Sequence, residues 1–373
     1  MDVNQKLPLL GGLSPAAFMK RHWQKKPLLV RQAWPQVVPP LTRGSLFELA
    51  SREDVESRLV SCVHGQWKLR SGPLPKRALP PLSRAGWTLL VQGLDLHVGA
   101  AHQMLQAFRF IPDVRLDDLM VSWASDGGGV GPHLDAYDVF LLQVQGRRRW
   151  QVGRVKHPQW VPDAPLKRLS NFQPEQEWVL EPGDLLYLPP NWGHDGVAVG
   201  GDCMTCSVGF QVPRAETLAR ELLLRVGDEE PMPSPFYRDP DQAATANPAA
   251  VPQSLLDFAQ QAIERRLSEP HWLARTLGEV LTEPKPQVWF EGQGETGVAG
   301  RVRLSPRTKM LYDLHHIFIN GEAFEASGRD ARLMRQLADR RALTPSELAR
   351  LSPAARQVVD QWVQAGWAQG EQA

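Results

Sequence analysis

The sequence predicts an α+β protein with a β-rich domain first, then helices, then a small mixed domain. Many short strand-like runs separated by glycine and proline turns occupy residues 116–212, and this pattern is typical of a sandwich or a small barrel. Helical spacing of apolar residues then covers 215–226 and 254–267. From about residue 285, strand-like runs are followed by three short helical runs. This last region therefore suggests a winged-helix-like module.

The region before residue 116 predicts a mixture of helices and strands. Ser14 followed by Pro15 is typical of a helix start, because serine caps free backbone N–H groups and proline fits the first turn. Helical spacing also covers 45–60 and 95–109, and extended runs stand at 26–31, 67–69 and 87–91.

Three turns flanked by strand-like runs each predict a β-hairpin, because short connections containing glycine favour chain reversal between strands. The first two are Gln145-Gly146, between 138–144 and 147–152, and the turn 181–184, between 178–180 and 185–188. The third is Asn320-Gly321, inside the run 316–324.

Charge and cysteine content narrow the classes of partner and compartment. Lys and Arg number 42 and Asp and Glu 41, so the formal charge is +1 and no overall basic field favours nucleic acid or an anionic membrane. Three cysteines are too few for a disulfide framework and suit a reducing compartment. No apolar run approaches the ~18 residues of a membrane helix, and the first residues lack the features of a signal peptide. We therefore expect a cytoplasmic protein with no membrane partner.

One glycine-rich turn leads to a histidine and a carboxylate two residues apart. His133 and Asp135 follow Gly127–Gly131, and in a strand residues i and i+2 point to the same face. An imidazole and a carboxylate are two of the three ligands that hold non-haem Fe(II) with open positions. His194, at the end of the turn 189–193, is the candidate for the third. The remaining histidines are expected to have structural or surface roles: His22, His64, His97, His102, His157, His271, His315 and His316.

Several motifs between residues 14 and 212 together resemble one enzyme family. They are Leu119-Met120-Val121-Ser122, Gly127 to Asp135, Tyr137-Asp138-Val139-Phe140, Gly146 to Trp150, Glu181 to Asp184 with Leu188-Pro189-Pro190, His194, and Ser207 to Phe210. They resemble the JmjC-type, cupin-fold Fe(II)/2-oxoglutarate oxygenases, and most of all the bacterial ribosomal oxygenases that hydroxylate an arginine of a ribosomal protein. The resemblance implies a double-stranded β-helix (jelly roll), Fe(II) as cofactor, and 2-oxoglutarate and O2 as co-substrates. It also implies arginine 3-hydroxylation of large-subunit ribosomal protein sixteen.

The same resemblance assigns His133, Asp135 and His194 as the iron ligands, and hence as catalytic residues. Arg148 is expected to hold the distal carboxylate of 2-oxoglutarate, because burying that charge requires a cation and a guanidinium can bind it at two points. Parity selects Arg148 among three consecutive arginines, since it shares a strand face with Trp150, which is expected to point inward.

Further site residues are expected on the strands around the metal. Ser122 and Thr205 are expected to bind the co-substrate. Side chains that share strand faces with these residues or with the ligands are expected to form the substrate pocket, with an acidic group favouring arginine: Asp118, Met120, Tyr137 and Ser207.

Three domains are expected: a JmjC/cupin catalytic domain at 1–212, a helical segment at 213–284 that makes a homodimer, and a winged-helix-like domain at 285–373. Two alternatives to arginine hydroxylation stay open at this point. One is another reaction of the same class, namely hydroxylation of histidine or asparagine, or demethylation of methyl-lysine. The other is a non-enzymatic cupin-like binding module with a nucleic-acid-binding end.

Overall fold

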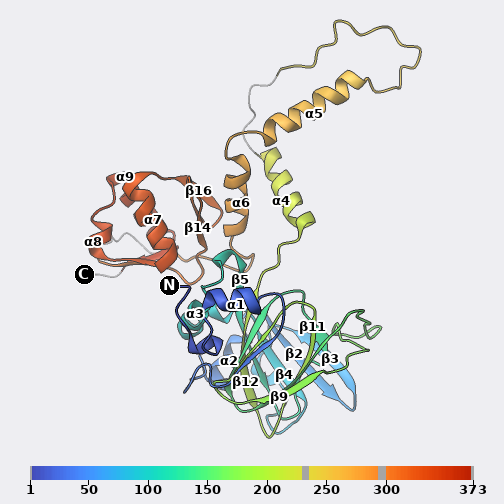
Figure 1. The fold of residues 1–373 in the computed structure, drawn as a ribbon, viewed down its shortest axis with the longest axis vertical. Helices are drawn as coiled ribbons and strands as arrows, with labels where there is room; N and C mark the ends of the chain where they lie inside the picture. Colours follow the sequence, from blue (N-terminus) through green and yellow to red (C-terminus); the bar gives the residue numbers. More distant parts are fainter. Residues whose placement is uncertain (1, 229–234, 293–299, 371–373) are drawn as a thin grey trace. The chain divides into compact units, whose positions relative to one another are not determined.

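The computed structural model describes residues 2–228, 235–292 and 300–370 (Figure 1). The chain forms two compact units, Met1–Val212 and Pro213–Ala373. Strands make up most of the first unit, whereas the second combines helices with two small sheets. The predicted division into three domains stays a prediction.

Two antiparallel sheets that pack through their inner faces form the first unit, which is the jelly-roll architecture expected from the sequence. The large sheet has the strand order β1-β10-β7-β12-β5-β4-β2-β3, and the small sheet has the order β6-β11-β8-β9. The strands are β1 (Leu28–Val30), β2 (Ser57–Val63), β3 (Gln66–Ser71), β4 (Trp87–Val91), β5 (Leu116–Ala124), β6 (His133–Leu134), β7 (Val139–Gln145), β8 (Arg148–Arg154), β9 (Gln176–Leu180), β10 (Leu185–Leu188), β11 (Trp192–Ala198) and β12 (Cys203–Phe210).

Residues of the large sheet alternate between an outer and an inner core. On β7, Phe140 and Leu142 belong to the outer core, which the N-terminal helices cover. Val139 and Leu141 point the other way and belong to an inner cluster with Trp150 of the small sheet. Side chains of a strand alternate between its two faces, and both faces of β7 carry buried apolar residues. β7 therefore packs against the N-terminal helices on one face and against the small sheet on the other.

Helices pack on the outer face through aromatic side chains. The ring of Phe18 lies 5.4 Å from that of Phe140 and 4.9 Å from that of Tyr187, centroid to centroid. Ser14 caps the first helix as predicted, since its hydroxyl accepts a hydrogen bond from Ala17 N–H at 3.2 Å. The helices of this unit are α1 (Pro15–Arg21), α2 (Arg43–Leu49) and α3 (Gly99–Gln106), with 3-10 turns η1 (Pro8–Leu10), η2 (Lys76–Ala78), η3 (Leu94–Leu96) and η4 (Asp113–Arg115).

Two of the three predicted hairpins are wrong. β7 pairs with β10 and β12 in the large sheet, whereas β8 pairs with β9 and β11 in the small sheet. The chain therefore crosses between sheets at Gly146, which has φ 64° and where a Cβ would lie 2.2 Å from the carbonyl oxygen of Asp202. The turn Glu181–Asp184 carries the chain from β9 to β10 in the same way. Turn residues predict a reversal of the chain, but tertiary pairing decides which strand becomes the neighbour.

The helical prediction for residues 45–60 is wrong in its second half. α2 ends at Leu49, and Ser57–Val63 forms β2, which pairs with β3 on one side and β4 on the other. Hydrogen bonding to two strands outweighs the weak helical spacing of this run, because strand formation depends mainly on cross-strand partners and burial.

The second unit begins with three helices: α4 (Ala215–Asp228), α5 (Gln253–Leu267) and α6 (Trp272–Thr282). α6 packs closely on the sheet that follows it. A Cβ on Gly278 would lie within 2.5 Å of the Phe318 ring, and the Thr282 hydroxyl accepts a hydrogen bond from Gly321 N–H at 3.1 Å. No helix in the described ranges is both long enough and apolar enough to cross a membrane.

Two three-stranded sheets and three helices complete the second unit around a shared apolar core. The sheets have the orders β17-β13-β18 and β14-β15-β16. The predicted Asn320-Gly321 hairpin is confirmed, since β15 and β16 are paired across it. The elements are β13 (Val302–Leu304), β14 (Met310–Tyr312), β15 (His316–Ile319), β16 (Glu322–Glu325), α7 (Gly328–Arg340), β17 (Ala342–Leu343), α8 (Pro345–Leu348), α9 (Pro353–Gln364) and β18 (Ala368–Gly370).

Candidate metal centre

Two neighbouring strands of the small sheet bring the candidate ligands together. His133 in β6 and His194 in β11 are direct partners in the ladder between these strands, and their ring centroids lie 4.2 Å apart. Asp135 follows β6, and its Oδ2 lies 3.5 Å from Nε2 of His194 and 3.9 Å from Nε2 of His133. Within the described ranges, no other group of three His, Cys, Asp or Glu residues brings its ligand atoms within 4.8 Å of one another.

Backbone carbonyls orient both imidazoles. Nδ1 of His133 donates to the carbonyl of Gly131 at 2.9 Å, and Nδ1 of His194 donates to that of Trp192 at 3.0 Å. Each Nε2 is then left with a lone pair, as in metal-bound histidines. Burial lowers the pKa of His194 to about 4, and the neighbouring His133 adds to this effect, so His194 is neutral at pH 7. Two imidazoles and a carboxylate facing one point fit Fe(II), which takes this donor set with positions left open.

The three candidate ligands open into a cavity of about 430 Å³. Both sheets contribute to its wall, with apolar side chains from β2 to β8 and a set of polar and charged side chains. A concave site that combines an apolar wall with convergent polar groups is typical of a small-molecule site. The polar and charged residues that line it besides the ligands are Arg58, Gln92, Asp117, Asp118, Ser122, Tyr137, Arg148, Lys167 and Ser207.

Arg148 points into this cavity, on the face that parity predicts. Its side chain is 3% exposed, and it lines the cavity together with Trp150. One guanidinium nitrogen donates to the Ser122 hydroxyl at 3.0 Å and another to the carbonyl of Gly196 at 3.1 Å, while Nε is buried with no hydrogen-bond partner. Its neighbour Arg149 points the other way, with Nη1 4.0 Å from Glu177. A buried guanidinium that faces a cavity is a binding group for an anion, because a buried charge needs a partner of opposite sign.

The two residues expected to bind the co-substrate differ in position. Ser122 lines the cavity and contacts Arg148. Thr205 is the direct partner of Ser122 in the β12–β5 ladder, but it does not line the cavity. It is fully buried, and its hydroxyl donates to Gln143 Oε1 at 2.9 Å. The role of Thr205 in binding the co-substrate stays a prediction; in this structure β7 lies beside β12 there, and the Thr205 hydroxyl donates to Gln143.

All four residues expected in the substrate pocket line the cavity. Asp118 is buried, and its Oδ2 accepts a hydrogen bond from Gly93 N–H at 2.7 Å. Tyr137 is 41% exposed, which places it near the mouth. Met120 and Ser207 are direct partners in the β5–β12 ladder, so they form adjacent parts of the wall.

Four polar or charged residues that line the cavity were not among the site residues expected from the sequence: Arg58, Gln92, Asp117 and Lys167. Arg58 and Gln92 lie on the β2 and β4 side, where Arg58 donates to Oε1 of Gln92. Asp117 lines the cavity as an exposed residue beside the buried Asp118. Recognition of the extended run 57–63 as a strand would have placed Arg58 on a sheet face and made it a candidate.

Comparison with known proteins gives the same architecture and one family. Residues 103–218 match the JmjC domain and residues 265–369 match the ROXA-like winged helix. The Escherichia coli K12 protein named ribosomal protein uL16 3-hydroxylase is 35% identical over 275 residues, which cover 73% of this chain and 72% of the relative. This chain belongs to the JmjC-domain ribosomal oxygenases. The resemblance and the fold class expected from the sequence are therefore confirmed.

Solved structures of this family match almost the whole chain. The X-ray structure of E. coli YcfD has a TM-score of 0.85 at 29% identity and covers 96% of this chain and 98% of its own. YcfD in complex with cobalt and 2-oxoglutarate has a TM-score of 0.82 at 29% identity, with coverage of 96% and 99%. Together with the donor set at the metal centre, this membership makes the chain an oxygenase of the Fe(II)- and 2-oxoglutarate-dependent type.

Proposed function

We propose that this chain is an Fe(II)- and 2-oxoglutarate-dependent hydroxylase that adds a hydroxyl group at position 3 of an arginine in ribosomal protein uL16. One observation carries the proposal: a set of metal ligands and a buried, anion-binding Arg148 face the same cavity. The uL16 substrate comes from the activity named for the E. coli relative. The acidic Asp118 in the cavity supports a cationic side chain as the target.

In this proposal His133, Asp135 and His194 hold the metal. Three protein ligands leave room for the keto-acid end of 2-oxoglutarate and for O2, and Fe(II) at this position supplies the oxygen activation that protein side chains lack. The backbone carbonyls that accept from both Nδ1 atoms keep the imidazoles in the metal-binding tautomer. The chain's own contribution is placement of the reactants and exclusion of water by the apolar wall.

Arg148 then anchors the distal carboxylate of 2-oxoglutarate, supported by Ser122. The hydroxyl of Ser122 and the carbonyl of Gly196 fix the guanidinium plane, so little side-chain freedom is lost when the carboxylate binds. The ring of Trp150 lies 5.1 Å below the guanidinium and packs it from one side. Both features favour a planar, two-point contact, which lysine could not make.

The target arginine is proposed to enter past Tyr137 and Met120, with its guanidinium at Asp118. Asp118 is buried and lines the cavity, and its Oδ2 accepts a hydrogen bond from Gly93 N–H, so its carboxylate is held in place at the wall of the site. Ser207, on the strand beside Met120, would contact the aliphatic stem. A charged hydrogen bond in a partly desolvated site would discriminate strongly against uncharged side chains.

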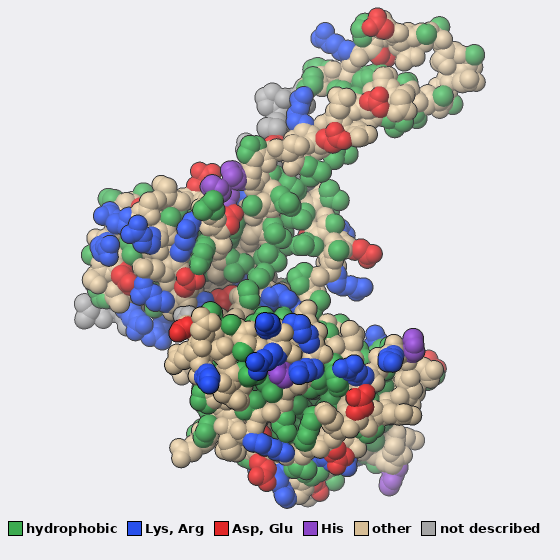
Figure 2. Space-filling model, in the orientation of Figure 1, with side chains coloured by type: hydrophobic (Ala, Val, Ile, Leu, Met, Phe, Trp, Pro, Cys, Tyr) green, Lys and Arg blue, Asp and Glu red, His purple; other side chains and the backbone are tan. Residues whose placement is uncertain are grey.

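A homodimer through the helical segment is the proposed assembly, in the cytoplasm where the ribosomal substrate is made. Support comes from large apolar side chains left exposed on α4 and α5, and hydrophobic side chains gather over these helices in Figure 2. Sedimentation should show a dimer, and Leu256→Glu with Ile263→Glu should give a monomer. The exposed apolar residues are Leu223, Leu224, Leu255, Leu256, Ile263 and Leu267.

The test of the proposed activity is a reaction of the iron-loaded protein with 2-oxoglutarate, O2 and three matched uL16-derived peptides. The peptides carry arginine, histidine or asparagine at the target position. Succinate formation and gain of one oxygen atom with the arginine peptide alone would support the proposal. Reaction with the histidine or asparagine peptide would assign a different hydroxylase activity, and a lack of 2-oxoglutarate turnover with any peptide would favour a binding module.

A further inference from the structure

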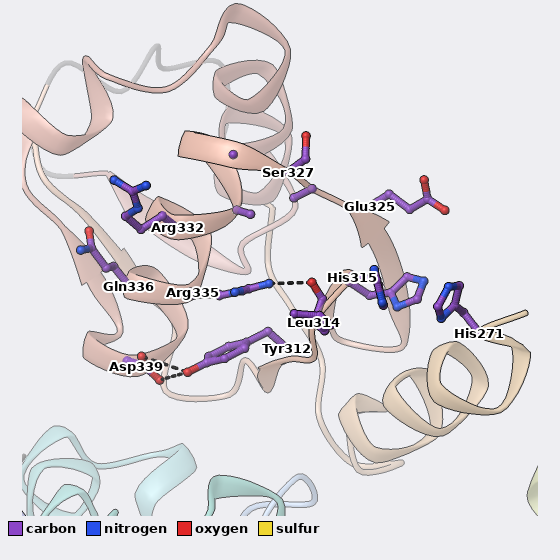
Figure 3. A pocket seen from close by; sticks show the side chains of 14 residues that line it. His271, Tyr312, Leu314, His315, Glu325, Ser327, Arg332, Arg335, Gln336 and Asp339 are labelled. Atoms are coloured by element: carbon purple, nitrogen blue, oxygen red, sulfur yellow. Dashed lines mark hydrogen bonds between the residues drawn. The ribbon is translucent and has the colours of Figure 1, made fainter.

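Three histidines that the catalytic centre does not use meet within the second unit (Figure 3). His271 precedes α6, His315 directly precedes β15, and His316 is the first residue of β15. The ring centroids of His271 and His315 lie 4.2 Å apart, and that of His316 lies 6.1 and 6.2 Å from them. In a tetrahedral site with Zn–N bonds of about 2.0–2.1 Å, centroids of bound imidazoles lie roughly 5 Å apart. The observed separations bracket that value.

Asp313 orients His316 in the way that suits a metal ligand. Its Oδ2 lies 3.1 Å from Nδ1 of His316, so the ring donates its Nδ1–H to the carboxylate. Its Oδ1 accepts the backbone N–H groups of His315 and His316 at 2.7 and 2.6 Å. A carboxylate on the far nitrogen makes Nε2 of a histidine a better donor to a metal.

Glu325 adds an oxygen donor on the same face. It is the direct partner of His316 in the β15–β16 ladder, and directly opposed residues project their side chains on one side of a sheet. Glu325 and the three histidines line one open cavity of about 1110 Å³.

Two arginines share this cavity, so their charges must be considered. Arg335 donates to the carbonyl of Leu314 at 2.8 Å, and its guanidinium lies over the Tyr312 ring. Arg332 lies at the end of the pocket opposite His271 (Figure 3). At the histidine end of the cavity, Glu325 and Asp313 carry carboxylates next to His316. Their negative charge favours binding of a cation there.

We propose that His271, His315 and His316 form a second site for a divalent transition-metal ion of the Zn²⁺ class, with Glu325 as an oxygen ligand and Asp313 as the residue that positions His316. Imidazoles with a carboxylate are suitable donors for such ions. The ligand atoms of these residues do not all lie within 4.8 Å of one another in this structure, so the site must close on the ion. We infer that it closes by rotation of His271 and His315, whose side chains are exposed, around the buried His316. The bound ion links the start of α6 to the start of β15 within the second unit.

The test is the zinc stoichiometry of the metal-free, full-length protein, measured by equilibrium dialysis. Wild type should bind two zinc ions, because Zn²⁺ also occupies the catalytic ligands. His133→Ala with Asp135→Ala removes the catalytic site and should leave one ion. The variant with His271→Gln and His315→Gln should also bind one zinc ion. Both side chains are exposed, so we expect the protein to fold normally with these changes.

Two further variants separate the new site from general histidine binding. His64→Gln with His157→Gln changes two exposed histidines of the first unit and should still bind two ions. Asp313→Asn keeps an oxygen acceptor for the backbone N–H groups but loses the charge, and should weaken the second site by roughly 10–100-fold while leaving the first unchanged. A single zinc ion on wild type, or two on His271→Gln with His315→Gln, would overturn the proposal.

Discussion

Replacing Arg148 tests whether the buried guanidinium anchors 2-oxoglutarate. Arg148→Ala leaves the metal ligands in place but removes the cation that faces the cavity. Arg148 makes two hydrogen bonds, to the Ser122 hydroxyl and to the carbonyl of Gly196. We therefore expect the fold to tolerate the change and the effect to appear when the co-substrate binds.

The size of the effect follows from the burial of the site. Loss of one partner of a buried charge pair costs roughly 3–5 kcal/mol, which at about 1.4 kcal/mol per tenfold change would be more than 10²-fold. Water can enter the space that Arg148 leaves and solvate the carboxylate, so we expect the lower part of this range. The apparent KM for 2-oxoglutarate should rise by about 10²–10³-fold, with little change in the KM for peptide. Arg148→Lys should recover part of the loss, because lysine restores the charge without the planar contact.

Arg149→Ala is the matched control on the same strand. Its side chain faces away from the cavity and lies 4.0 Å from Glu177, so its removal should leave both KM values nearly unchanged. Initial rates of succinate formation, with each substrate varied in turn, give both constants. An unchanged 2-oxoglutarate KM in Arg148→Ala, or an equal rise in Arg149→Ala, would refute the assignment of the anchor.

Three further predictions concern the metal, the substrate and acid stability. His133→Ala or Asp135→Ala should abolish O2-dependent 2-oxoglutarate turnover with the fold intact, and wild-type turnover in either would remove that residue from the ligand set. Asp118→Asn should keep uncoupled turnover but weaken arginine-peptide hydroxylation by roughly 1.5–3 kcal/mol, measured as kcat/KM for the peptide. A wild-type kcat/KM in this variant would contradict the pocket proposed around Asp118. Burial alone would raise the pKa of Asp184, but hydrogen bonds from backbone N–H groups and from Arg31 outweigh burial, so the net effect of folding is to lower this pKa. The Asp184 carboxylate therefore stabilises the fold above the pKa of about 4 that it has in the unfolded chain. This stabilisation is lost as the pH falls through the pKa of the folded state. Urea unfolding should show Asp184→Asn less stable than wild type at pH 7 and the difference shrinking below about pH 4; a constant difference would contradict this.

The metal centre could be predicted because its signal is local. His133 and Asp135 stand two residues apart, and a strand projects such side chains to one face. Arg148 was selected by the same alternation, since it shares a face with Trp150. Both inferences depend only on the direction in which side chains point along a strand. That direction is known as soon as the segment is recognised as extended, because side chains alternate between the two faces.

Strand pairing could not be predicted in the same way. The glycine turn at Gly146 indicates a reversal, but the chain uses it to cross from the large sheet to the small one. Arg58 was missed for a related reason, because its run gains strand structure only by pairing with β3 and β4. Thr205 has the predicted parity, but Gln143 occupies its hydroxyl. Each of these outcomes depends on residues distant in sequence.

The most direct test of the central claim is tandem mass spectrometry of a uL16-derived arginine peptide after reaction with the iron-loaded protein, 2-oxoglutarate and ¹⁸O-labelled O2. The account predicts one labelled oxygen on carbon 3 of the arginine, formed together with succinate, and no product with His133→Ala. An unmodified arginine in the presence of rapid 2-oxoglutarate turnover, or a labelled oxygen on any other residue, would contradict it.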